Sequence, residues 1–275
     1  MSIKIVSDSS ANMFHLDGID FESADMVIST DEKEYRDNEQ LNVEQMVAEL
    51  ASYKGRSGTA CPGVGEWLKA FGEAKEVYCT TITARLSGSY NAAMAAKEQY
   101  EEEHPDRKVF VFDSRSAGPE MKLHIEKIRE FIQEGMDFDS ISKKIAEYKE
   151  KTSIAFSLEC VRNLANNGRI NSAVATVVGM LGIRIIGNAD GGVLNPTDKV
   201  RGEKKAIAKI VENMKKAGYV GKKVYIDHCY NEAGAEALKK ALLTEFPNAV
   251  IKIARTYGLC SFYAEKGGLM IGFEH

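Results

Sequence analysis

The chain has 275 residues and a formal net charge of −4, with 44% hydrophobic and 28% charged residues. This is the composition of an ordinary globular protein, long enough for one large domain or two smaller ones. The slightly acidic balance argues against general nucleic-acid binding, which requires a basic surface. The five cysteines are scattered along the chain, so neither a disulfide framework nor a metal site is predicted.

Short β-branched or aromatic runs alternate with longer helical patterns along the whole chain. This alternation predicts an α/β protein with mostly parallel sheets flanked by helices. Apolar residues at helical spacing, as at Val43, Met46 and Leu50, predict helices that bury one face. The expected strands are residues 3–6, 26–29, 76–79, 109–112, 154–157, 183–186, 224–227, 251–254 and 269–272.

The N-terminus lacks the long apolar core of a signal peptide. No segment approaches the roughly 20 apolar residues of a membrane span. The sequence therefore predicts a cytoplasmic protein without an integral membrane segment.

The first candidate site lies near the middle of the N-terminal half, where an expected strand runs into hydroxyl residues and then into a helix beginning at Ser89. Unpaired backbone N–H groups and the positive end of a helix dipole meet at such a junction. Ser87, Gly88 and Ser89 can therefore receive a carboxylate or a phosphate. The alternative is that Ser87 only caps the helix, as serine commonly does.

A second junction of similar chemistry lies upstream, around Thr59. Pro62 cannot donate a hydrogen bond and suits turns, so residues 59–62 are interpreted as a shaped loop that exposes the Thr59 hydroxyl. Cys61 lies beside it, either as a reactive thiol or as a buried structural cysteine.

In this order the motifs resemble the DegV family of bacterial fatty-acid-binding proteins, over nearly the whole chain. The family's opening Ser-Asp-Ser is matched at residues 7–9, its Thr-Ser-Gln-Pro loop approximately at 59–62, and its Leu-Ser-Gly-Thr-Tyr loop at 86–90. A strand ending in Asp-Ser is matched at 109–114, Gly-Gly-Arg-Ile by Asn167-Gly168-Arg169-Ile170, and Lys-Val-Arg at 199–201.

The resemblance implies a fold of two α/β domains and a carrier that can present a fatty acid to a fatty acid kinase. It associates Arg169 with the head-group end and Arg201 with docking of the kinase. The alternative for Arg169 is a structural role in its loop, and the alternative for Arg201 is a solvated basic face. Tyr263 stands where the family commonly carries a histidine, and Ala60 and Cys61 replace a polar pair. These departures bear on hand-over to the kinase and on packing around the head group.

The division into domains also rests mainly on the resemblance. We place the boundary in the charged helical stretch 139–151, which gives an N-terminal domain 1–150 with the head-group loops and a C-terminal domain 151–275. The ligand is expected where the two domains meet, a common place for small-molecule sites.

Enzymatic alternatives remain open at this stage. A hydrolase or transferase could use Ser87 or Cys61 as an acyl nucleophile, although Ser87 lacks both glycines of a nucleophile elbow. His228 follows an expected strand at the position where α/β sites form. No dinucleotide, Walker or metal motif is present, so no cofactor is predicted.

A fatty acid fits these residues in energetic terms. Burial of about 15 methylenes offers on the order of 12 kcal/mol before the cost of immobilisation, whereas each charge-assisted hydrogen bond contributes roughly 1.5–3 kcal/mol. We therefore expect a non-catalytic binder in which Thr59, Ser87 and the N–H groups of Gly88 and Ser89 hold the carboxylate. A binder of another amphipathic anion is a further alternative.

Overall fold

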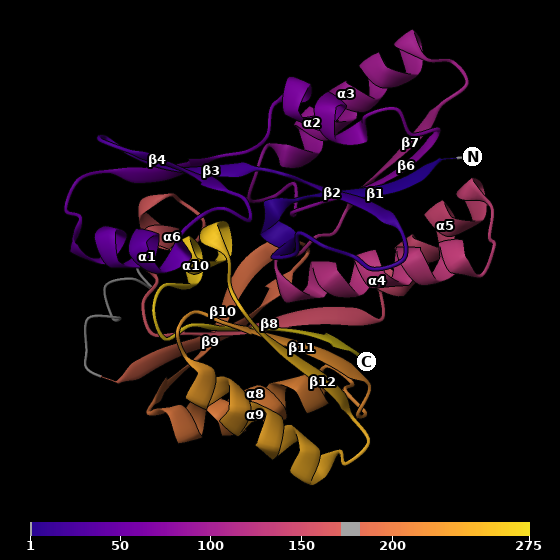
Figure 1. Cartoon of the computed structure of the whole chain (residues 1–275). Coiled ribbons are helices and arrows are strands. Elements are labelled where there is room, and N and C mark those ends of the chain that lie inside the picture. Colours follow the sequence, from indigo (N-terminus) through magenta and orange to yellow (C-terminus); the bar gives the residue numbers. More distant parts are fainter. Residues whose placement is uncertain (1, 172–181) are drawn as a thin grey trace.

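The computed structural model describes residues 2–171 and 182–275, and Figure 1 shows it as a stack of layers. Two larger sheets lie one above the other. Helices α2 (Val64–Phe71) and α3 (Ser89–Glu103) cover the outer face of the first sheet, and α8 (Glu203–Lys216) and α9 (Glu232–Glu245) cover the outer face of the second. Helix α4 (Pro119–Gln133) lies between the sheets and contacts both.

The N-terminal sheet has four parallel strands in the order β2-β1-β6-β7. Its outer core includes Trp67, the one tryptophan of the chain, which is fully buried on α2. Helix α5 (Phe138–Lys149) joins α4 on the inner face. The strands are β1 (Ile3–Asp8), β2 (Asp20–Ala24), β6 (Glu76–Thr81) and β7 (Lys108–Asp113).

The C-terminal sheet has six strands in the order β10-β9-β8-β13-β11-β12. Among these described strands only β11 and β12 are parallel, so the expectation of mostly parallel strands holds for the first sheet and not for the second. The difference has two causes, because β9 pairs antiparallel with both β8 and β10, and β13 inserts antiparallel between β8 and β11. The strands are β8 (Thr152–Leu158), β9 (Ile183–Asp190), β10 (Val193–Arg201), β11 (Lys223–His228), β12 (Val250–Arg255) and β13 (Leu269–Glu274).

A three-stranded antiparallel sheet, β4-β3-β5, adjoins this stack at one side. It consists of β3 (Met26–Thr30), β4 (Glu34–Asp37) and β5 (Ser57–Ala60). The short elements η1 (Ser9–Ala11), α1 (Val43–Ser52), α6 (Arg162–Asn166) and α10 (Gly258–Ala264) complete the described fold.

The fold class is confirmed, and each of the nine expected strands corresponds to an observed one. Sequence patterns missed β2, β4, β5 and β10. The interpretation of residues 59–62 as a loop was wrong for Thr59 and Ala60, because Thr59 pairs with Ile28 in the small sheet. The division into domains 1–150 and 151–275 stays a prediction; its boundary falls in the turn between α5 and β8.

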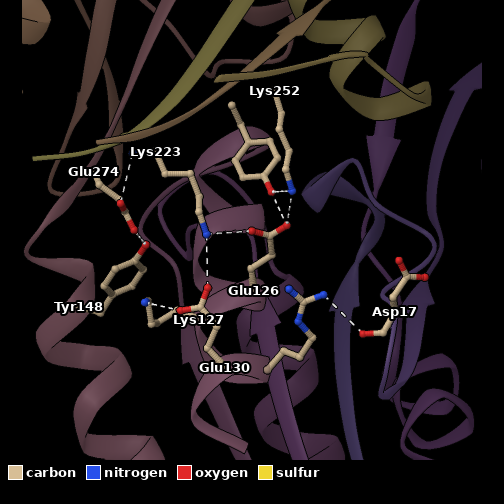
Figure 2. A network of polar contacts seen from close by, with 10 residues as sticks. Asp17, Glu126, Lys127, Glu130, Tyr148, Lys223, Lys252 and Glu274 are labelled. Carbon is tan, nitrogen blue, oxygen red and sulfur yellow. Dashed lines mark hydrogen bonds and ion pairs between the residues drawn. The ribbon is translucent and has the colours of Figure 1, made fainter. Parts of the chain in front are cut away.

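Helix α4 meets the C-terminal sheet through a polar network, which Figure 2 shows. Lys223 on β11 lies 3.2 Å from a Glu126 carboxylate oxygen and 3.3 Å from one of Glu130. Lys252 on β12 lies 3.2 Å from the other oxygen of Glu126. One turn earlier on α4, Lys122 forms a buried ion pair with Asp227 at 2.7 Å. The charged face of α4 therefore ties this helix, which also contacts β1 and β6, to the C-terminal sheet.

Candidate functional site

A cavity of about 320 Å³ lies where the two larger sheets and the small sheet meet. Five of the six residues that the sequence assigned to a ligand site line it: Thr59, Ser87, Gly88, Arg169 and Tyr263. The sixth, Ser89, is not among the described residues that line it. Segments that are far apart in the sequence thus form one wall.

Thr59 and Tyr263 form one side of the polar end. The Thr59 hydroxyl and the Tyr263 hydroxyl lie 2.8 Å apart, and either can donate to the other. Burial raises the pKa of Tyr263, although the bond to Thr59 and the nearby charge of Arg169 oppose this shift. The phenol therefore stays neutral and can donate a hydrogen bond.

The Ser87 loop forms the facing side, between the end of β6 and the start of α3. A side-chain carbon added at Gly88 would lie 3.4 Å from the Cys61 sulfur, so this loop touches the segment that follows Thr59. Ser87 Oγ accepts the N–H of Ser89 at 3.3 Å, and Gly88 occupies the N-cap of α3. The loop combines a hydroxyl with the positive end of a helix of 15 residues.

Ser89 points the other way. Its side chain is fully buried, and its hydroxyl donates to the carboxylate of Asp8 at 2.6 Å. Because its backbone N–H is also used, by Ser87 Oγ, the geometry does not support a direct contact between Ser89 and a ligand.

Arg169 extends from the turn after α6 to the same end of the cavity. Its Nε donates to the Leu86 carbonyl at 3.0 Å, and another guanidinium nitrogen donates to the Asn167 carbonyl. Gly168 has φ +69°, a left-handed conformation that suits glycine and turns the chain toward the cavity. Arg169 is half-buried and places a cation in the same cavity lining as Thr59 and Ser87.

The remaining wall is apolar and comes mostly from the inner face of the C-terminal sheet. The side chain of Met270 reaches across to the start of α4, since a Cβ at Gly118 would lie 2.8 Å from its terminal methyl group. The apolar lining on this side consists of Ile154, Phe156, Leu158, Ala189, Leu194 and Met270.

The turn between β9 and β10 closes over the Ser87 side. Thr83 Oγ1 donates to the Gly192 carbonyl at 3.0 Å, and both residues line the cavity. Gly192 has φ +86°, and a Cβ there would lie 2.3 Å from Thr83 Oγ1. Only glycine therefore permits this close approach of the two segments.

Three other candidates lie as follows. Cys61 lines the cavity, beside the Ser87 loop. His228 is buried at the end of β11, where its Nδ1 accepts the N–H of Asn231 at 3.2 Å, so its observed role is to hold a turn. Arg201 is the last residue of β10 and is exposed, away from the described lining. No group of His, Cys, Asp and Glu side chains suited to hold a metal ion occurs within residues 2–171 and 182–275.

One residue that the sequence patterns did not identify is Asp8, a buried residue that supports the cavity wall without lining the cavity. Asp8 is completely buried and accepts hydrogen bonds from three segments at the cavity. It occurs in the motif at residues 7–9, but the motif alone does not show which groups it contacts. No described helix combines the length and the apolar character needed to cross a membrane.

The fold and the cavity together define a class: an α/β protein whose layers enclose a mainly apolar cavity with a polar, cationic end. The family described as "Uncharacterised protein, DegV family" matches residues 2–275. A DegV domain-containing protein of Streptococcus gordonii is 39% identical over 279 residues, covering 100% of this chain and 99% of that protein. The chain belongs to the DegV family.

Two solved structures are similar over almost the entire chain. A DegV family protein from Eubacterium eligens loaded with heptadecanoic acid has 41% identity and a TM-score of 0.98, with 99% of each chain covered. The Streptococcus pneumoniae fatty acid kinase (Fak) B3 protein loaded with linoleic acid has 39% identity and a TM-score of 0.97, with 100% of this chain and 99% of that chain covered.

Proposed function

We propose that this protein is a non-catalytic carrier that encloses a long-chain fatty acid in the cavity between its sheets. The observation that carries the proposal is the amphipathic cavity, which combines one polar end with an apolar wall in a chain 39–41% identical to fatty-acid-loaded DegV proteins. The acyl chain supplies most of the affinity by burial, and the polar end fixes its direction.

The carboxylate is assigned to the end formed by β5, the Ser87 loop and α10. Thr59 and Ser87 offer hydroxyl donors, Gly88 offers the start of α3, and Arg169 supplies a positive charge. Tyr263 orients the Thr59 hydroxyl through the contact between their two hydroxyl groups. Hydrogen bonds to a charged group are each worth about 1.5–3 kcal/mol, sufficient to select an acid over an ester.

We further propose that the carrier presents its ligand to a fatty acid kinase in the cytoplasm. The support is the similarity to the Fak B3 protein and the exposed position of Arg201, which can contact a partner without touching the ligand. All five cysteines are free thiols, which suits a reducing compartment.

An acyl-enzyme using Ser87 or Cys61 is the second candidate. The position of Cys61 on the cavity wall is the observation in its favour. Against it, His228 holds a turn and His124 is buried against Thr152 at 2.9 Å, so neither is positioned as a base for Ser87. Another amphipathic anion is the third candidate.

Native mass spectrometry of the purified protein, followed by organic extraction, tests the proposal directly. We expect a near-stoichiometric, non-covalent long-chain fatty acid. A protein that remains empty after incubation with a panel of fatty acids would favour another anion, whereas a stable covalent acyl adduct on Ser87 or Cys61 would favour the enzyme.

A further inference from the structure

Asp8 connects three segments that surround the polar end of the cavity. One carboxylate oxygen accepts the hydroxyl of Ser10 on η1. The other accepts the backbone N–H of Ile82 at 3.0 Å and the hydroxyl of Ser89 at 2.6 Å. Ser10 and Ile82 line the cavity, and Ser89 directly follows the lining residues Ser87 and Gly88.

Asp8 is a buried carboxylate whose described hydrogen-bond partners are hydroxyl and amide groups and not a cation. It is fully buried, and burial raises the pKa of its carboxyl group although the surrounding donors oppose the shift. Asp227, also fully buried, instead has the Lys122 ammonium group 2.7 Å away. Asp8 is held by hydroxyl and amide donors, whose directions constrain geometry more than a point charge does.

These contacts continue to the head-group loop through Ser89. The Ser89 hydroxyl is fixed by Asp8, and the Ser89 N–H is donated to Ser87 Oγ at 3.3 Å. Gly88 lies between them, and a glycine has no side chain to restrict its own conformation. The orientation of Ser87 and Gly88 therefore depends on a contact made behind the cavity wall.

We propose that Asp8 and Ser89 are positioning residues for head-group recognition. They hold the Ser87 loop in the one orientation that aims its hydroxyl and the start of α3 at a ligand carboxylate. This inference rests on the proposed function for its ligand, but the bracing of the loop is a property of the empty protein as well.

The test compares Ser89→Ala with Ser89→Thr, which retains the hydroxyl. The first readout is backbone amide exchange of residues 82–89 in the ligand-free protein; we expect faster exchange in the alanine variant and parental exchange in the threonine variant. The second readout is the ratio of dissociation constants for hexadecanoic acid and its methyl ester. Loss of one such hydrogen bond predicts that the preference for the acid falls about tenfold in the alanine variant only.

Asp227→Asn serves as the matched control, because it alters another fully buried aspartate whose described partners, Asn12 and Lys122, do not line the cavity. We expect it to lower the unfolding midpoint while keeping the preference for the acid. Parental exchange and preference in Ser89→Ala would overturn the inference, as would an equal loss of preference in Asp227→Asn. If the parent protein binds no fatty acid, the proposed function fails, and amide exchange alone still decides whether Asp8 and Ser89 brace the loop.

Discussion

The hydroxyl of Tyr263 on α10 lies 2.8 Å from the hydroxyl of Thr59 on β5, although 204 residues separate them in the chain. This pair joins the small sheet to the C-terminal half at the polar end of the cavity. Tyr263→Phe removes the contact while keeping the ring, so we expect the affinity for a fatty acid to fall about three- to tenfold. Titration with a fluorescent fatty acid measures this. Tyr100→Phe is the control. The Tyr100 hydroxyl donates to the backbone carbonyls of Gly72 and Ala74, after α2, so we expect its loss to leave the affinity for the fatty acid unchanged.

Thr59 and Ser87 together are expected to decide between an acid and its ester. The combined change Thr59→Val and Ser87→Ala removes both hydroxyl donors, so the preference for hexadecanoic acid over its methyl ester should fall by at least about tenfold. Competition binding measures the ratio. A double variant that discriminates as well as the parent would show that the carboxylate lies elsewhere.

Met270 is expected to limit the length of the acyl chain. Its side chain spans from β13 to Gly118 and lines the cavity. Met270→Ala removes three heavy atoms, so the preferred chain should lengthen by about two to three carbons, each worth roughly 0.8 kcal/mol. Binding of a series of saturated acids measures the shift. Met214 lies on the buried face of α8, so Met214→Ala should destabilise the fold without changing the ranking of chain lengths.

Asp37 is expected to make the stability of the fold depend on pH. It accepts the N–H groups of Gly258 and Leu259 at 2.7 and 2.9 Å, and burial raises its pKa from 3.8 to about 6. Between these two pKa values the folded state binds a proton that the unfolded state does not. The contribution of Asp37 to the free energy of unfolding is therefore greatest below pH about 4 and is lost as the pH rises through about 6.

The expected size is about 3 kcal/mol, from roughly 1.4 kcal/mol per pKa unit. Urea unfolding at several pH values should therefore show the stability of the parent falling by this amount relative to Asp37→Asn as the pH rises. The exposed Asp106, changed to Asn, should follow the parent. Parallel pH profiles of the parent and Asp37→Asn would contradict the assignment.

Arg201 separates hand-over from binding. Because it is exposed at the end of β10, outside the described cavity lining, Arg201→Glu should leave fatty acid occupancy unchanged and reduce phosphorylation of the bound acid by a fatty acid kinase. Extraction of the ligand and a phosphorylation assay measure the two effects. Unchanged phosphorylation with full occupancy would remove Arg201 from the proposed docking surface.

Sequence patterns predict the helices and strands whose buried residues recur with a strong period. They fail for strands whose position depends on pairing with distant parts of the chain. Strand β10 alternates exposed and partly buried residues and contains Pro196, which weakens the strand pattern. Its signal was the pair Gly191-Gly192 between two extended runs, typical of a two-residue hairpin turn. The antiparallel position of β13 has no local signal, because nothing near the C-terminus encodes which strands it enters.

The site shows the same limit. Thr59 and Ser87 could be chosen from their own chemistry, because hydroxyls near a strand-to-helix junction suit an anion, whereas Arg169 was assigned from the family resemblance. The direction of the Ser89 side chain could not be predicted, because it depends on Asp8, 81 residues away in the chain. The apolar wall of the cavity could not be predicted either, because Phe156 and Met270 lie in strands whose sequence pattern is that of ordinary core strands.

The burial of Trp67 on the outer side of the N-terminal sheet has a practical meaning for all of these experiments. As the one tryptophan of the chain, it provides a single indole fluorophore, and it lies in a core formed by α2, α3 and the sheet. Its emission should respond to loss of the fold and remain nearly unchanged when the cavity fills. Trp67 emission can thus report unfolding while a fluorescent fatty acid reports ligand loading, which gives two separate optical signals in one sample.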